Sequence, residues 1–198
     1  MLYHLLRVSL ILLFSIVFRW KVRGRENIPA TGKVIMASNH CSNADPLLIG
    51  AAASRRVRFL AKEELFSPSW FGNILKFLGT IPVKRGVGDR AAIKMALDIL
   101  AAGSAFIMFP EGTRSKSGQL GKAQPGIAMI AIKSQTPVIP VAITGTFRFF
   151  RKGNRFPQFT VSFGKPILPP ECSHLSKEVM ADFGQKLMEE IAILKAEV

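Results

Sequence analysis

Short apolar segments alternate with segments of helical periodicity between residues 33 and 163, and this alternation limits the fold more than any other feature. The helical segments carry apolar residues three and four positions apart, as Ile93, Ala96, Leu97 and Leu100 do. The apolar segments predicted as strands are residues 33–38, 55–61, 79–85, 105–109, 137–143 and 159–163, the last as an edge strand. This order predicts an α/β domain with a largely parallel or mixed sheet flanked by helices, whose functional loops leave strand ends.

Length and charge restrict the possibilities further. The chain has 198 residues, 48% of them hydrophobic, which is enough for one domain with a sizeable core and too short for two. Its formal net charge of +14 indicates an anionic partner, which could be nucleic acid, an acidic membrane surface or an acidic ligand. Residues 112–170 contain Lys and Arg but no Asp or Glu. Charge alone does not choose among these partners.

Residues 2–18 (LYHLLRVSLILLFSIVF) hold twelve Leu, Ile, Val or Phe and predict a membrane-associated helix. At 1.5 Å per residue this helix would be about 26 Å long, slightly shorter than a bilayer core of about 30 Å. It could therefore be partly immersed rather than cross. A cleaved signal peptide fits poorly, because the positive charge follows the apolar run instead of preceding it. A soluble core helix is a further alternative.

The flanks of this helix predict its orientation. Tyr3 and Trp20 bracket it as interfacial anchors would, and four basic residues follow it closely. They are Arg19, Lys21, Arg23 and Arg25. We therefore expect a membrane-associated segment at residues 1–25 and a catalytic domain at residues 26–198, on the cytoplasmic face of the cell membrane.

The motif NHCSNAD at residues 39–45 places His40 five residues before Asp45. On a regular helix the two side chains would point about 140° apart, so a working pair needs a turn. The sequence provides one, because residues 33–38 predict a strand and Asp45-Pro46 predicts the start of a helix. His40 is then a candidate general base and Asp45 the carboxylate that orients it. Alternatively, Asp45 only caps a helix and His40 only satisfies a turn.

The two cysteines, Cys41 and Cys172, show no CxxC spacing and no nearby histidine cluster. They therefore predict neither a disulfide framework nor a zinc site, and a reducing compartment fits best. Cys41 adjoins His40 and invites comparison with a cysteine nucleophile. Neighbouring side chains rarely face each other, so we expect a small filler residue instead.

A second motif, FPEGTRS at residues 109–115, follows the predicted strand that begins at Ala105. Together with Asn39-His40 and Asp45 it resembles the signatures of the glycerolipid acyltransferases, the family of 1-acylglycerol-3-phosphate acyltransferases. Residues 79–85 (GTIPVKR) and 138–143 (VIPVAI) resemble the glycine-to-arginine block and the proline block of that family. All four blocks occur in family order across residues 39–143.

The resemblance implies transfer of a fatty acyl group from a thioester, on acyl carrier protein or coenzyme A, to the free hydroxyl of 1-acylglycerol 3-phosphate, giving phosphatidic acid. It implies His40 and Asp45 as catalytic residues and Arg85, Glu111, Gly112, Thr113 and Arg114 as substrate-binding residues. In the family the two arginines bind the phosphate, and the glutamate and glycine position the glycerol. No metal or other cofactor is expected. Glycerol 3-phosphate and a lyso-aminolipid stay open as alternative acceptors.

Residues 146–156 (TFRFFRKGNRF) interleave aromatic rings with Arg and Lys, as a surface for single-stranded nucleic acid can. A loop facing an anionic membrane has the same composition. Because an apolar helix is predicted at the N-terminus, we favour an anionic membrane surface as partner and no nucleic acid. A basic membrane-binding or nucleic-acid-binding module without catalysis is the alternative from another class.

Overall fold

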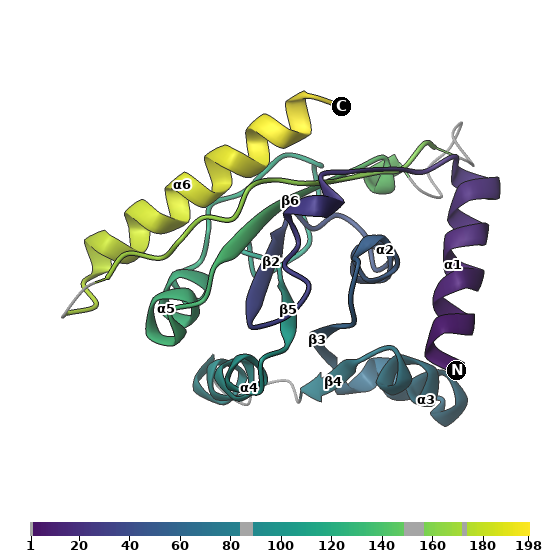
Figure 1. Ribbon diagram of the computed structural model, residues 1–198, viewed down its shortest axis with the longest axis horizontal. Helices are drawn as coiled ribbons and strands as arrows, with labels where there is room; N and C mark the ends of the chain where they lie inside the picture. Colours follow the sequence, from purple (N-terminus) through teal and green to yellow (C-terminus); the bar gives the residue numbers. More distant parts are fainter. Residues whose placement is uncertain (1, 84–88, 149–156, 172–173) are drawn as a thin grey trace.

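The computed structural model describes residues 2–83, 89–148, 157–171 and 174–198. Its described strands form one sheet in the order β1-β7-β6-β2-β5-β3-β4 (Figure 1). They are β1 (Lys21–Arg23), β2 (Val34–Ser38), β3 (Val57–Lys62), β4 (Thr80–Val83), β5 (Ala105–Met108), β6 (Val138–Thr144) and β7 (Thr160–Phe163). Neighbouring strands run parallel except β6 and β7, which are antiparallel. The prediction of an α/β domain with a mixed sheet is confirmed.

The prediction that residues 159–163 form an edge strand is wrong. β7 lies between β6 and β1, and β1 is the strand at that edge of the sheet. The pairing of β1 with β7 runs in parallel from Lys21 opposite Thr160 to Arg23 opposite Ser162. Lys21 and Arg23 are both exposed. In the sequence alone, a segment of three residues with two charged side chains indicates a basic flank of the preceding helix and not a strand.

Helices cover both faces of the sheet (Figure 1). One face packs against α4 (Asp89–Ala101), α5 (Pro125–Ser134) and α6 (Lys177–Ala196), and the other against α1 (Leu2–Phe18) and α2 (Asp45–Ala52). Between β3 and β4 lies α3 (Ser69–Phe77), and three short 3-10 helices are η1 (Arg25–Asn27), η2 (Glu63–Phe66) and η3 (Thr146–Arg148).

β2 is the central strand of the fold, and all five of its residues are buried. Ile35 and Ala37 point into the core beneath α4, α5 and α6, while Val34 and Met36 point into the core beneath α1 and α2. This alternation follows from the two-residue period of a strand that is covered on both faces. The loop that leaves β2 therefore starts from one of the best-packed positions in the molecule.

Local sequence signals fix several helix ends. Ser176 is a residue type that favours helix N-termini, and its Oγ accepts a hydrogen bond of 3.2 Å from the Val179 N–H at the start of α6. Ser67-Pro68 separates η2 from α3. Gly103 follows α4 with a φ of 71°, in the left-handed region where helices commonly end.

The N-terminal helix α1 has one packed side and one exposed side. Phe14 and Phe18 are buried in the core, where each contributes about 1.5–3 kcal/mol, and Phe18 stacks on Phe159 with ring centroids 4.3 Å apart. Leu12 and Ile16 are 54% and 77% exposed. In the part of the chain that the structure describes, no helix combines the length and hydrophobicity needed to cross a bilayer.

Candidate active site

The loop at residues 39–44 leaves the carboxyl end of β2, where β6 and β5 flank that strand. Ligands of open α/β sheets bind at this edge. Asn39 fixes the start of the loop, because its buried amide donates to the Ile143 carbonyl at 2.9 Å and accepts from the Ile143 N–H at 2.8 Å. The sequence showed Asn39 only as part of a motif and indicated no role for its side chain.

His40 and Asp45 lie in contact, as the functional interpretation requires. Nδ1 of His40 lies 2.8 Å from Oδ2 of Asp45, and the same oxygen accepts hydrogen bonds of 2.7 Å from the N–H groups of Cys41 and Ser42. Asp45 is the first residue of α2, after the N-cap Ala44, and its side chain turns back toward the loop. The carboxylate is buried, so it closes the loop around the histidine rather than serving as an exposed helix cap.

The plane of the His40 ring is also held in place. Phe109, at the carboxyl end of β5, stacks on the imidazole with ring centroids 3.9 Å apart and an interplanar angle of 17°. The His40 side chain is 16% exposed. With Nδ1 on Asp45, Nε2 is the nitrogen that can take a proton from a substrate. The role of Phe109 could not be found from the sequence. An aromatic residue after a strand does not show which side chain it will contact.

Cys41 does not have the properties of a nucleophile. Burial, followed by the nearby Asp45 carboxylate, raises the pKa of the Cys41 thiol above its usual value. At neutral pH it is therefore a thiol rather than the reactive thiolate. This supports the expectation that Cys41 takes no covalent part.

Glu111 joins two loops through their backbones. Its Oε1 accepts a hydrogen bond of 3.3 Å from the His40 N–H, and its Oε2 accepts one of 2.9 Å from the Gly121 N–H. A further bond of 2.7 Å runs from the Ser115 N–H to the His40 carbonyl. The loop after β5 is thereby attached to both backbone groups of His40. Each carboxylate oxygen of Glu111 keeps a lone pair for a substrate hydroxyl.

The other predicted binding residues follow Glu111 directly. Gly112 has a φ of 72° and its N–H closes a turn onto the Phe109 carbonyl, a conformation that favours glycine. Thr113 and Arg114 are exposed. Within the described ranges no hydrogen bond or ion pair engages the Arg114 side chain, and Arg114 directly precedes Ser115, whose N–H donates to the His40 carbonyl. Its guanidinium is thus available at the rim of the site.

Two predicted features lie outside the described residues. Arg85 belongs to residues 84–88, which follow the end of β4 at Val83, and most of the aromatic and basic segment 146–156 falls in residues 149–156. The structure therefore brings together His40, Asp45 and the loop that carries Glu111 and Arg114. The position of Arg85 relative to them stays a prediction.

An imidazole held by a buried carboxylate, with an exposed arginine nearby, has the chemistry to take a proton from the hydroxyl of an anionic substrate. The chain belongs to the acyltransferase family, whose pattern it matches over residues 19–144. The resemblance to the glycerolipid acyltransferases, which rested on four sequence blocks, is confirmed.

Relatives and a solved structure agree with this assignment. The chain is 29% identical over 180 residues, 88% of its own length and 87% of the relative's, to 1-acyl-sn-glycerol-3-phosphate acyltransferase of Bacillus subtilis. It is 35% identical over 132 residues to the Pseudomonas aeruginosa enzyme of the same name, covering 63% of this chain and 49% of that one. It superposes with a TM-score of 0.77 and 30% identity on the crystal structure of the LPA acyltransferase PlsC from Thermotoga maritima, covering 97% of this chain and 79% of that one.

Proposed function

We propose that the protein transfers a fatty acyl group from an acyl thioester, on acyl carrier protein or coenzyme A, to the free hydroxyl of 1-acylglycerol 3-phosphate, giving phosphatidic acid. The observation that carries the proposal is the 2.8 Å contact between His40 Nδ1 and Asp45 Oδ2, which leaves Nε2 for the substrate. The relatives bear this activity in their names.

The proposed reaction needs only the two substrates and the His40–Asp45 pair. Nε2 of His40 removes the hydroxyl proton as the oxygen attacks the thioester carbonyl carbon. Asp45 stabilises the imidazolium that forms. When the tetrahedral intermediate collapses, the C–S bond breaks and the imidazolium returns its proton to the leaving sulfur. The ester and a free thiol are the products, and no acyl-enzyme is formed.

In the same proposal, Arg114 and Arg85 bind the phosphate of the acceptor and Glu111 and Gly112 align its glycerol. A guanidinium suits a phosphate because it donates two parallel hydrogen bonds. Glu111 already bonds the His40 N–H, so a glycerol hydroxyl on its remaining lone pairs would lie close to the base.

Replacing Arg114 by alanine is expected to raise the KM for 1-acylglycerol 3-phosphate about ten- to a hundredfold, because charge-assisted hydrogen bonds are worth about 1.5–3 kcal/mol. Steady-state kinetics with varied acceptor measure this. Arg90→Ala, at an exposed arginine on α4, removes the same charge and should leave the KM unchanged. An unchanged KM in Arg114→Ala would remove the assigned role.

The identity of the acceptor is tested with purified protein and a panel of acceptors. We expect turnover with 1-acylglycerol 3-phosphate and much less with glycerol 3-phosphate or a lyso-aminolipid. A preference for either of these would keep the family and change the reaction. Absence of acyl transfer with every acceptor, using both coenzyme A and carrier-protein thioesters, would favour a non-catalytic basic binding module.

We further propose that the protein works on the cytoplasmic face of the cell membrane, with α1 lying in the anionic surface. Leu12 and Ile16 form an apolar side of α1, and the net charge of +14 favours acidic headgroups. Exposed basic residues follow the helix, namely Arg19, Lys21, Arg23 and Arg25.

The double variant Leu12→Glu/Ile16→Glu is expected to bind anionic vesicles about a hundredfold more weakly, since it loses about 3 kcal/mol of apolar insertion. Vesicle co-sedimentation measures the partition. Leu168→Glu/Ile193→Glu makes the same change at two exposed apolar residues outside α1, which are 73% and 53% exposed. Equal weakening in both double variants would show that net charge, and not α1, governs binding.

A further inference from the structure

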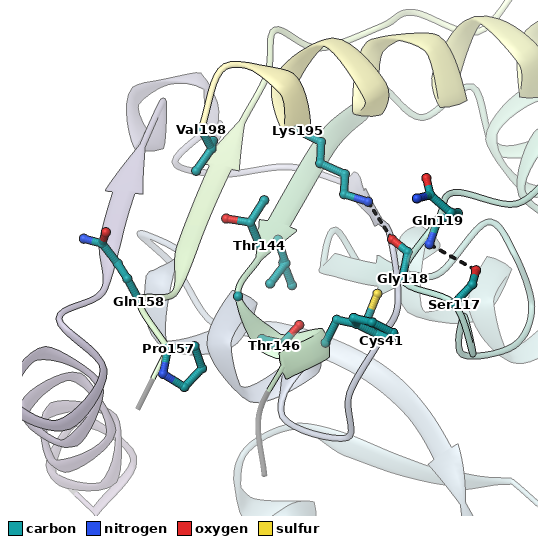
Figure 2. A pocket seen from close by; sticks show the side chains of 13 residues that line it. Cys41, Ser117, Gly118, Gln119, Thr144, Thr146, Pro157, Gln158, Lys195 and Val198 are labelled. Atoms are coloured by element: carbon teal, nitrogen blue, oxygen red, sulfur yellow. Dashed lines mark hydrogen bonds between the residues drawn. The ribbon is translucent and has the colours of Figure 1, made fainter. Parts of the chain in front are cut away.

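A cleft of about 550 Å³ opens beside the candidate active site, on the side of β6 and β7 (Figure 2). Its walls come from four segments: the loop after β2, the loop after β5, the junctions of β6 and β7, and the last turn of α6. Cys41, the neighbour of His40, points its sulfur into this cleft. The cleft is therefore lined by the residue that directly follows the proposed general base in the chain.

The sheet topology places this cleft on one side of β2. His40 follows β2, which has β6 on one side and β5 on the other. The cleft lies on the side of β6, whose residues Ile143 and Thr144 line it. The loop after β5, which carries Glu111 and Arg114, reaches the cleft from the other side through Ser117, Gly118 and Gln119. A molecule in the cleft would thus lie beside the loop that is proposed to hold the acceptor.

The lining of the cleft is mixed. Polar residues such as Ser117, Gln119 and Thr144 alternate in it with apolar ones such as Ile143 and Pro157. A fatty acyl chain there would cover a hydroxyl such as that of Thr144 without offering it a hydrogen bond, at about 1–3 kcal/mol for each such group. A ligand with several amide and hydroxyl groups would satisfy them. The volume falls within the range of about 300–1,000 Å³ that is usual for small-molecule sites.

Lys195 supplies the positive charge of the cleft. From the last turn of α6 its Nζ donates a hydrogen bond of 2.7 Å to the Gly118 carbonyl (Figure 2). An ammonium group has three donors, so two others can serve a ligand. The Lys195 charge acts on the Cys41 thiol, which agrees with both groups facing one space.

We propose that this cleft binds the phosphopantetheine arm of the acyl donor, with the polar residues of the lining on its amides and Lys195 on its phosphate. The proposal rests on the proposed acyl-transfer function and adds a donor site to it. The arm is common to coenzyme A and to acyl carrier protein, and in this position its thioester end lies toward Cys41 and His40. The acyl chain itself lies outside the cleft.

The first test uses Cys41 as a reporter of occupancy and does not depend on turnover. Slow alkylation of Cys41 by N-ethylmaleimide at mildly alkaline pH, where part of the thiol is ionised, is followed by peptide mass spectrometry. It is measured in the presence of S-methyl coenzyme A, S-methylated holo-carrier protein, apo-carrier protein or adenosine 3′,5′-bisphosphate. A bound arm should slow alkylation about tenfold at ten times its dissociation constant, because only free protein reacts. Apo-carrier protein and the nucleotide, which lack the arm, should not protect.

Protection by S-methyl coenzyme A, by the methylated holo-carrier protein or by both supports the site, and the pattern identifies the source of the arm. Protection by the nucleotide equal to that by S-methyl coenzyme A would overturn the proposal, since the arm would then contribute nothing. Absence of protection by either arm-bearing probe at ten times the donor KM would also overturn it.

The second test is kinetic. Lys195→Met should raise the donor KM about tenfold, as expected for one lost charge-assisted hydrogen bond, and leave the acceptor KM unchanged. Lys186→Met removes the same charge at an exposed position on α6 and should change neither constant. A rise in the acceptor KM without a rise in the donor KM would mean that Lys195 acts only by holding the Gly118 loop.

The two tests distinguish failure of the site from failure of the function. If Cys41 is protected but no acceptor is acylated, the cleft binds the arm and the proposed reaction is wrong. If acyl transfer proceeds while Cys41 is unprotected and Lys195→Met has a normal donor KM, the reaction stands and the donor binds elsewhere.

Discussion

Replacing His40 by alanine is expected to lower the rate of acyl transfer about 10²- to 10⁴-fold, the range for loss of a positioned general base. The effect should appear in kcat, because Nε2 of His40 is proposed to act on the hydroxyl proton in the transition state. Steady-state kinetics with 1-acylglycerol 3-phosphate and an acyl thioester measure it.

The fold should tolerate this change, because the backbone bonds of the loop do not need the imidazole. The His40 N–H bonds Glu111 and the His40 carbonyl accepts from the Ser115 N–H, and alanine keeps both groups. Circular dichroism and thermal unfolding check this. His174→Ala, at an exposed histidine after the described gap at 172–173, serves as the matched control. Turnover within a factor of about three of the parent would rule out general-base catalysis by His40.

Much of this site could be predicted from the sequence because its signals are local. A buried strand ending at Ser38 and a proline-containing helix start at Asp45 require a tight loop between them, and a loop of that length brings a histidine and a carboxylate five residues apart into contact. The strand before Phe109 and the turn at Gly112 were predictable for the same reason, since a short apolar run and a glycine that favours the left-handed region are properties of short segments.

Features that depend on contacts between distant segments could not be predicted. β1 is a strand only because β7 provides its partner 139 residues later, at the pair Lys21 and Thr160. The amide of Asn39 matters because Ile143 lies beside it. Nothing in the sequence of the last helix indicates that Lys195 reaches the cleft, because this depends on how α6 packs against β6.

Asp45→Asn is expected to lower turnover about ten- to a hundredfold, less than His40→Ala does. The two N–H groups of Cys41 and Ser42 both donate to Oδ2 of Asp45. In the asparagine variant they should hold the amide oxygen in that place, so the Nδ1–H of His40 keeps its acceptor and the imidazole keeps its tautomer. The variant loses the negative charge opposite the developing imidazolium. It also replaces Oδ1, a hydrogen-bond acceptor, by a buried NH₂ group.

The double variant His40→Ala/Asp45→Asn tests whether Asp45 acts through His40. If it does, the asparagine should cost nothing further once the imidazole is gone, because residues that act as a unit are not additive. Kinetics of the two single variants and the double variant give the coupling. A double variant slower than His40→Ala by the full Asp45→Asn factor, with unchanged thermal stability, would mean that the buried carboxylate contributes to catalysis by a route other than the histidine.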